Sequence, residues 1–285
     1  MTLFQILILA MVQGAAELLP VSSSAHVIVA EKLMGLDPTT PEMTLLLVML
    51  HTGTMFAVIL YFWKSWKESF FSSSRAFVEA MKFVLAATLV TGIVGLALKH
   101  LIEKFFMKDV PHAEIELLFG NMTLISISLA VAGILILFAG LKTRNASMNN
   151  RDLDMKESLQ VGAIQGLCLP FRGFSRSGAT ISTGLLLGIS RRKIEEFSFA
   201  LAVVLTPAVI IREVMRLLKT QHADSATHLA SMFMPGMLGM VFSFFAGLLA
   251  LKWLSSWLEE GRWHYFGIDC LCASIVVFSL HQAGY

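Results

Sequence analysis

The sequence predicts an all-α polytopic membrane protein. We expect an inverted-topology repeat, in which each half has one re-entrant helical hairpin and three transmembrane helices. Of the 285 residues, 56% are hydrophobic and 15% are charged, and the mean hydropathy is +0.72. Soluble domains carry about 25% charged residues, so this chain belongs mostly in lipid. A short pattern that occurs twice predicts the repeat.

The first copy of the pattern lies at residues 12–26 and the second at residues 164–180. Each copy has Gln-Gly, an apolar stretch with one proline, and a serine-rich turn. Gln13 corresponds to Gln165, and Ser22 corresponds to Ser175. The ionisable residues within these apolar flanks are Glu17, His26, Arg172 and Arg176. Ionisable groups at membrane depth are costly, which makes them functional candidates.

Each half begins with two short apolar helices that a polar turn separates, at 2–12 and 21–33 and again at 159–169 and 180–189. A full span needs about 20 apolar residues, so each pair predicts a re-entrant hairpin. Irregular backbone at this depth requires surrounding protein or a water-filled cavity. Six full spans are expected, at residues 44–63, 83–98, 117–141, 197–218, 229–251 and 266–280. Pro207 is expected to kink the fourth of these.

The resulting plan is one integral membrane domain with two repeats. Residues 1–141 form the first repeat, with its hairpin at about 2–34, and residues 159–285 form the second, with its hairpin at about 159–189. Residues 142–158 form a polar cytoplasmic linker. Three spans per half, an odd number, make the second repeat enter from the opposite side.

The distribution of Lys and Arg predicts the orientation. One side holds the segments 64–82, 142–158, 190–196 and 252–265 and carries thirteen of these residues, whereas the other side carries seven. Cytoplasmic loops are enriched in Lys and Arg. The side with thirteen is therefore expected to be cytoplasmic, with both termini on the opposite side.

Charge and cysteine usage exclude several classes of function. The net charge is only +2, and no basic stripe is present, so nucleic acid is not an expected partner. The three cysteines lie in apolar segments and predict neither a disulfide framework nor a metal cluster. The apolar N-terminus lacks a basic leader, so it is expected to stay in the mature protein. No organic cofactor is expected.

The first repeat places four polar residues within ten positions of its turn, namely Glu17, Ser22, Ser23 and His26. Gln13 lies four residues before Glu17, so both share one helix face. Structural alternatives exist for each residue: a carboxylate bonded to a helix end, serines that cap a helix, and a satisfied interior histidine. Their concentration at one turn favours a functional site.

The second repeat has the features of an anion site. Arg176 lies between Ser175 and Ser177, with Gly178 and Thr180 following, where a helix should begin. Free backbone N–H groups and the helix dipole favour phosphate there, and a guanidinium binds two phosphate oxygens at once. The alternative is an arginine that extends to the membrane interface. Phosphate opposite a Ser/His/Glu set predicts phosphoryl transfer.

In these motifs the chain resembles the undecaprenyl pyrophosphate phosphatase family, also called the bacitracin-resistance protein family. The resemblance covers nearly the whole chain. The family motifs are similar to residues 13–17, 20–26, 173–180 and 196–198. One departure is Arg172, which stands where the family has proline, with Pro170 two residues upstream. Arg172 is thus either a second phosphate contact or the partner of a carboxylate.

The resemblance implies an enzyme that removes the terminal phosphate of undecaprenyl diphosphate. It would recycle this lipid carrier for peptidoglycan synthesis and confer bacitracin resistance. The location implied is the bacterial cytoplasmic (inner) membrane, with the site facing the periplasm or cell exterior. The resemblance also implies a divalent cation, Mg²⁺ or Ca²⁺, for which Glu17 is the natural oxygen ligand. The range of accepted polyprenyl diphosphates and the oligomeric state, with a homodimer as one option, stay open.

We hypothesise that Ser23 is the nucleophile, that His26 acts as its base, and that Glu17 holds a metal or orients His26. Two rival mechanisms are direct attack by His26 and attack by metal-bound water. The residues expected to bind phosphate are Arg176, Ser175, Ser177, Thr180, Gln13 and Ser22. A rival of another class is a polyprenyl-phosphate flippase or secondary transporter, because inverted repeats with re-entrant hairpins are typical of transporters.

Overall fold

The structure, a computed structural model, describes residues 1–36, 40–106, 118, 120–143, 151–220 and 226–284; within these ranges, side chains 41–42, 106, 209, 212–213, 216–220 and 226–232 are not described. This part of the chain forms ten helices, and its only β-pairing is an isolated bridge between Arg151 and Ile189. The all-α class is therefore confirmed. The helices are α1 (Leu3–Leu18), α2 (Ser23–Leu33), α3 (Pro41–Ser69), α4 (Ser74–Phe106), α5 (Met122–Thr143), α6 (Met155–Cys168), α7 (Arg176–Leu186), α8 (Arg191–Thr220), α9 (Ala226–Glu259) and α10 (His264–Gln282).

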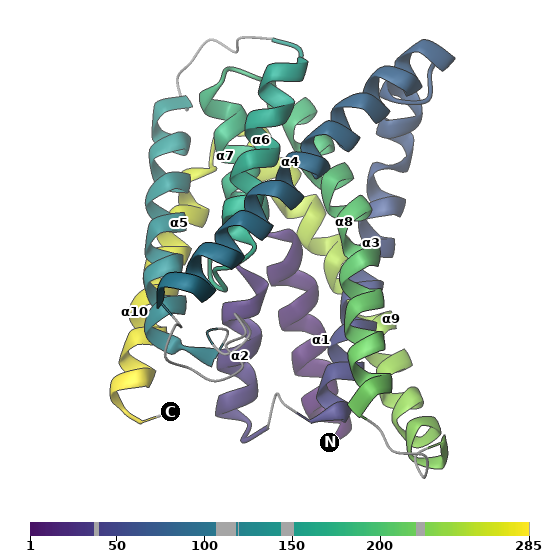
Figure 1. Cartoon of the computed structure of the whole chain (residues 1–285), viewed down its shortest axis with the longest axis vertical. Coiled ribbons are helices and arrows are strands. Elements are labelled where there is room, and N and C mark those ends of the chain that lie inside the picture. Colours follow the sequence, from purple (N-terminus) through teal and green to yellow (C-terminus); the bar gives the residue numbers. More distant parts are fainter. Residues whose placement is uncertain (37–39, 107–117, 119, 144–150, 221–225, 285) are drawn as a thin grey trace.

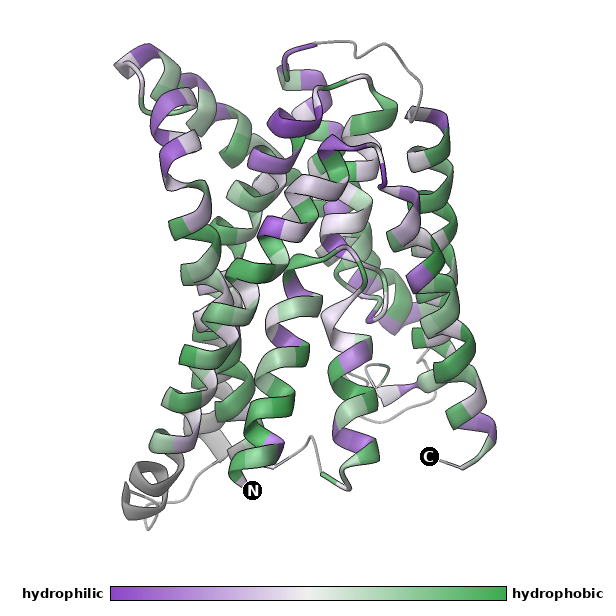
Figure 2. Ribbon diagram, turned by 180° about the vertical axis from the view of Figure 1, so that it is seen from behind, coloured by the Kyte–Doolittle hydropathy of each residue, from purple (hydrophilic) through white to green (hydrophobic). Residues whose placement is uncertain are grey.

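Five helices among the described residues are long and apolar enough to cross a membrane, namely α3, α4, α5, α9 and α10. Large apolar side chains remain exposed along them, for example Leu89 and Leu96 of α4 at 65% and 70%. Figure 2 shows hydrophobic residues along these helices and hydrophilic residues gathered at one end of the molecule. Apolar surface of this extent indicates contact with lipid, so the chain is a multi-pass membrane protein.

The sixth expected span, residues 197–218, falls within α8, part of whose side chains lie outside the described residues. It stays a prediction, as does the kink at Pro207, which lies inside α8. Two further expectations concern residues outside the described ranges: the start of the third span at residue 117 and part of the linker at 144–150.

Two pairs of short helices, α1 with α2 and α6 with α7, form hairpins. Figure 1 shows that they enter the bundle from opposite ends and that their tips approach each other in the interior. The backbone N–H of Gly173, in the second tip, donates a 3.4 Å hydrogen bond to Ser24 Oγ of the first. The start of α1 and the end of α10 lie at the same end of the molecule (Figure 1).

The expectation that the first helix stops before Gln13 is wrong, because α1 continues to Leu18. The Gln13 side chain does not interrupt the helix, since it donates to Glu17 one turn later. The helix ends instead where Leu19 adopts extended backbone, at φ −75° and ψ 150°, directly before Pro20. Proline disfavours helical backbone in the residue that precedes it.

The linker is also shorter than the expected 142–158. At its start α5 continues to Thr143, and at its end α6 begins at Met155. A capping box starts α6: Glu157 N–H donates to Asp154 Oδ1 at 2.9 Å, and Asp154 N–H donates to Glu157 Oε2 at 3.1 Å. This reciprocal cap satisfies two N–H groups that the first turn of a helix otherwise leaves unpaired.

The repeated Gln-Gly has a packing role, because its glycine lets a hairpin helix approach a long helix closely. A Cβ on Gly14 would lie 2.7 Å from the Ser243 carbonyl oxygen of α9. A Cβ on Gly166 would lie 2.8 Å from the Thr91 carbonyl oxygen of α4. Accordingly α1 packs on α9, and α6 packs on α4. The first helix of each half of the chain thus packs on the fourth helix of the other half.

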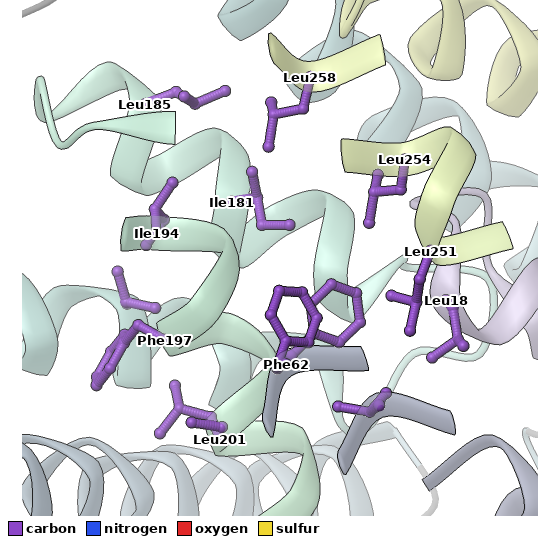
Figure 3. Close-up of a cluster of buried hydrophobic side chains, with 14 of the residues drawn as sticks. Leu18, Phe62, Ile181, Leu185, Ile194, Phe197, Leu201, Leu251, Leu254 and Leu258 are labelled. Atoms are coloured by element: carbon purple, nitrogen blue, oxygen red, sulfur yellow. The ribbon is translucent and has the colours of Figure 1, made fainter. Parts of the chain in front are cut away.

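A large apolar core surrounds the second hairpin and fixes its position (Figure 3). Leu18 enters it from α1, Phe62 from α3, Ile181 from α7 and Leu251 from α9. Phe62 stacks on Phe199 of α8, with 5.2 Å between ring centroids. Because helices from both halves of the chain contribute, burial in this core fixes the two hairpin tips relative to each other.

Candidate active site

The turn between α1 and α2 is strained at the residue that precedes α2. Ser22 has φ 66° and ψ 93° and is the one non-glycine residue with positive φ in the described ranges. Its side chain forms no cap hydrogen bond on α2. His26 Nδ1 donates to the Ser22 carbonyl oxygen at 2.9 Å. Strained backbone of this kind clusters at functional sites, so the reading of Ser22 as an ordinary helix cap is not supported.

Glu17 is the centre of a hydrogen-bond network at this turn. Its Oε2 accepts bonds from Ser23 Oγ at 2.5 Å and from Gln13 Nε2 at 3.2 Å. Its Oε1 accepts a bond from Arg176 Nη2 at 2.9 Å. His51 Nε2 of α3 lies 3.7 Å from Oε2. The Ser23 hydroxyl is therefore oriented toward a carboxylate that can accept its proton.

Arg176 opens α7 and reaches the first hairpin from the second. Ser175 caps this helix, since its Oγ accepts a 3.2 Å bond from the Gly178 N–H. The Arg176 side chain lies beside Glu17. The two side chains are 26% and 14% exposed, respectively. This ion pair joins a group suited to binding phosphate with the group that orients Ser23.

A cavity of about 180 Å³ lies between the two hairpin tips. Its polar and charged lining residues are Glu17, Ser22, Ser23, Ser24, Arg172, Ser175, Arg176 and Ser177. The structure thus brings together most of the residues that the sequence singled out. The hydroxyls and the two guanidinium groups can bind a phosphorylated headgroup here, beside one carboxylate.

The structure places His26 in a different cavity. This second cavity, of about 250 Å³, lies between α2 and α10 and is lined by His26 and Asp269, among mainly apolar residues. His26 Nε2 is 4.0 Å from Asp269 Oδ2, and Nδ1 is engaged by the Ser22 carbonyl. No hydrogen bond links His26 to Ser23 in the described part of the chain. The expected Ser23–His26 contact is therefore not present, because Ser23 turns toward Glu17.

Gln13 and Thr180 also lie outside the cavity between the tips. Gln13 is 1% exposed and supports Glu17. The Thr180 hydroxyl donates to the Arg176 carbonyl oxygen at 2.9 Å and bonds to Ser198 Oγ at 2.7 Å. These contacts make Thr180 part of the link between α7 and α8. A phosphate contact by either residue stays a prediction.

Sequence reasoning missed three residues near the site. His51 approaches Glu17, and Asp269 approaches His26. Glu31 of α2 is 1% exposed and interacts electrostatically with Arg172. An available signal was that each is an ionisable residue in an apolar helix. Their spacing along the chain gave no indication of which residues they would meet.

A divalent cation fits this cavity in one way. Among the described residues no group of three His, Cys, Asp or Glu side chains is placed to hold a metal. Glu17 is the carboxylate that lines the cavity. Mg²⁺ is often bound by one or two carboxylates together with substrate phosphates. Glu17 and the Ser23 hydroxyl are therefore suited to a cation that arrives with a diphosphate.

Comparisons with known proteins identify the family of the chain. The family model described as bacitracin resistance protein BacA matches residues 6–276. The chain belongs to this family. It is 60% identical over 283 residues to undecaprenyl-diphosphatase 2 of Acinetobacter baylyi, covering 98% of each chain.

More distant relatives match over equally long stretches. The undecaprenyl-diphosphatase of Fusobacterium nucleatum is 31% identical, over 96% of this chain and 99% of its own. That of Korarchaeum cryptofilum is 29% identical, over 98% of this chain and 100% of its own. The likeness thus includes both hairpins and the long helices that hold them.

Proposed function

We infer that this chain is a membrane phosphatase that hydrolyses undecaprenyl diphosphate to undecaprenyl phosphate and inorganic phosphate. The names of its relatives support this activity. So does its membership of the bacitracin resistance family. The observation that carries the inference is the network of Ser23, Glu17 and Arg176 between the hairpin tips. In a cell the reaction would recycle the lipid carrier for peptidoglycan synthesis and confer bacitracin resistance.

Substrate binding would begin with an exchange of partners by Arg176. In the structure this guanidinium is paired with Glu17. An incoming terminal phosphate offers two oxygens to the same planar fork. Ser177 and the N-terminus of α7 would add hydroxyl and N–H donors on the same side of the cavity. As Arg176 turns to phosphate, Glu17 would lose a positive neighbour and become a better proton acceptor.

The chemical step would be attack by Ser23 Oγ on the terminal phosphorus. The hydroxyl proton passes to Glu17 Oε2, the O–P bond forms, and the bond from phosphorus to the bridging oxygen breaks. Undecaprenyl phosphate leaves with that bonding pair. Water then attacks the phosphoserine and releases inorganic phosphate, while Ser23 regains its proton. Arg176 stabilises the charge that develops on the phosphoryl oxygens.

A bound Mg²⁺ or Ca²⁺ would supply further charge neutralisation at the phosphates. Glu17 is the residue proposed to hold it. Chelation of divalent cations would then lower phosphate release, and addition of Mg²⁺ would restore it. Undiminished release by chelated protein would remove the cation from the proposal.

We propose that α1–α2 and α6–α7 are re-entrant hairpins of an inverted-topology repeat. Their opposite directions of entry support this (Figure 1). Positive-inside counting supports a cytoplasmic location for the turn between α3 and α4, and thus a site that opens to the periplasm of a bacterial inner membrane. A cysteine at Ser72 should then be labelled from the cytoplasm alone. Periplasmic labelling would reverse the orientation. A cysteine at Asn149, a residue outside the described ranges, should likewise be labelled from the cytoplasm.

A lipid flippase or secondary transporter is the alternative function, and the opposed hairpins are the observation that favours it. A carrier needs Arg176 for binding but does not need Ser23 oriented on Glu17. Release of phosphate from undecaprenyl diphosphate by the purified chain tests the enzyme directly, with Ser23→Ala as the inactive control. Absence of phosphate release by the wild-type chain, or equal release by the wild type and Ser23→Ala, would contradict the phosphatase mechanism. A homodimer is compatible with either function.

A further inference from the structure

The second hairpin tip carries two guanidinium groups, and each interacts electrostatically with a carboxylate of the first hairpin. Arg176 pairs with Glu17 at 2.9 Å. Arg172 interacts electrostatically with Glu31. Both arginines line the cavity between the tips. One ion pair and one electrostatic interaction between a carboxylate and a guanidinium therefore cross the same interface.

Glu31 has the surroundings of a carboxylate that needs a cation. Its side chain is only 1% exposed, and its Oε1 has no hydrogen-bond partner among the described residues. A buried charged group is costly unless a partner compensates it. Its immediate neighbour along the chain, Lys32, is more exposed. Among the described residues, Arg172 is the cation whose charge acts on Glu31.

The backbone explains why Arg172 reaches this part of α2. Gly173 N–H donates to Ser24 Oγ. The backbone next to Arg172 therefore lies against the face of α2 that bears Ser24. Residues seven apart return to nearly the same face of a helix, so Glu31 lies on that face, about 10 Å further along. The proline of the family pattern lacks a side-chain charge, and Arg172 stands in its place.

We propose that Glu31 is a positioning residue that holds Arg172 over the cavity, where Arg172 binds the inner phosphate of a diphosphate while Arg176 binds the terminal one. This deepens the proposed function and rests on it. A monophosphate would bind to Arg176 alone and would not reach Arg172. The Glu31–Arg172 pair would thus make the site prefer diphosphates, the substrates, over the monophosphates that are products.

Binding of inorganic ions tests this without any turnover. The affinity of the purified full-length chain for inorganic pyrophosphate and for inorganic phosphate would be measured by titration calorimetry. Arg172→Ala and Glu31→Gln are each expected to weaken pyrophosphate binding about tenfold, the loss typical of one charge-assisted hydrogen bond. Phosphate binding should stay unchanged. Glu79→Gln makes the same chemical change on an exposed part of α4 and should affect neither ion.

Two further variants separate positioning from folding. In the Arg172→Ala background, Glu31→Gln should have no additional effect on pyrophosphate affinity. Arg172→Lys keeps a charge for Glu31 but loses the planar fork, so it should fold and still bind pyrophosphate weakly. Equal weakening of both ions, an additive double variant, or a wild-type chain that does not prefer pyrophosphate would each overturn the proposal. Failure of the phosphatase activity would appear separately, as absence of phosphate release by a chain that binds pyrophosphate.

Discussion

Arg176 Nη2 donates a 2.9 Å hydrogen bond to Glu17 Oε1 and so joins the tips of two hairpins that enter the molecule from opposite ends. The pair brings together residues 159 positions apart. Oε2 of the same carboxylate accepts a hydrogen bond from the Ser23 hydroxyl. The Glu17 side chain therefore links the arginine proposed to bind phosphate with the proposed nucleophile, Ser23. The local sequence around either residue gives no indication of this contact.

Arg176→Lys tests the guanidinium directly. Lysine keeps the charge but lacks the planar guanidinium that can donate two parallel hydrogen bonds to a phosphate. We expect phosphate release to fall about 10²-fold, as for loss of one preorganised donor at a reacting group. Arg75→Lys, at an exposed position of α4, is the matched control. Near-normal turnover in Arg176→Lys would show that a point charge suffices.

The two glycines of the repeated Gln-Gly should be intolerant of larger residues. Gly14→Val and Gly166→Val would each press against a backbone carbonyl of a long helix. Overpacking typically costs about 1–3 kcal/mol, so both variants should melt at lower temperature in detergent. Gly92→Val is the control, because nothing lies within 4 Å of a Cβ there. Equal melting temperatures for the three variants would show that Gly14 and Gly166 are not required for close helix packing.

His26 has a role that two substitutions can separate. Its Nδ1 donates to the carbonyl oxygen of the strained Ser22, and the amide of asparagine can make a similar bond. If His26 positions the turn, His26→Asn should retain much of the activity that His26→Ala loses. If His26 is instead a proton acceptor, both variants should lose about 10²-fold to 10⁴-fold. Rates of phosphate release from matched preparations decide between the two roles.

Glu195 predicts a pH dependence of stability. It precedes the expected span of α8, and burial raises its pKa to about 8, although the Ser255 hydroxyl opposes the shift by donating to Oε1 at 2.5 Å. Glu259 and Glu196 raise its pKa further, and Arg192 lowers it.

The direction of the effect follows from the raised pKa. The folded state holds the Glu195 proton more tightly than the unfolded state, so stability falls as pH rises from about 4.5 to about 8. Glu195→Gln stays neutral and should melt at higher temperature than the wild type near pH 9, with little difference near pH 4. Melting curves at both pH values check this. A variant that is less stable than the wild type near pH 9 would mean that the folded protein stabilises the Glu195 carboxylate, which contradicts the raised pKa.

Composition and repeated motifs were sufficient to predict the helical class, the hairpins and most of the cavity. Apolar stretches separated by polar turns report directly on burial in lipid. Helix ends were harder to predict, because they depend on tertiary contacts. Gln13 seemed to interrupt α1, but its amide is satisfied by Glu17 within the helix.

Side-chain partners were the least predictable feature. The spacing of Ser23 and His26 favoured a shared face, yet Ser23 turns to Glu17 and His26 turns to Asp269. Ser22, with its positive φ of 66°, lies directly before Ser23 in this turn, and no local pattern predicted that backbone. His51 comes from α3, and no local pattern could place it beside Glu17.

The central claim, that Ser23 is the nucleophile, is tested most directly by trapping the phosphoryl group. Undecaprenyl diphosphate labelled at its terminal phosphorus would be mixed with the purified chain, quenched, and the bound label tested for acid stability. We predict acid-stable label on Ser23 and none on Ser23→Ala, because phosphoserine survives acid and phosphohistidine does not. Acid-labile label on His26, or full activity of Ser23→Ala, would contradict the account.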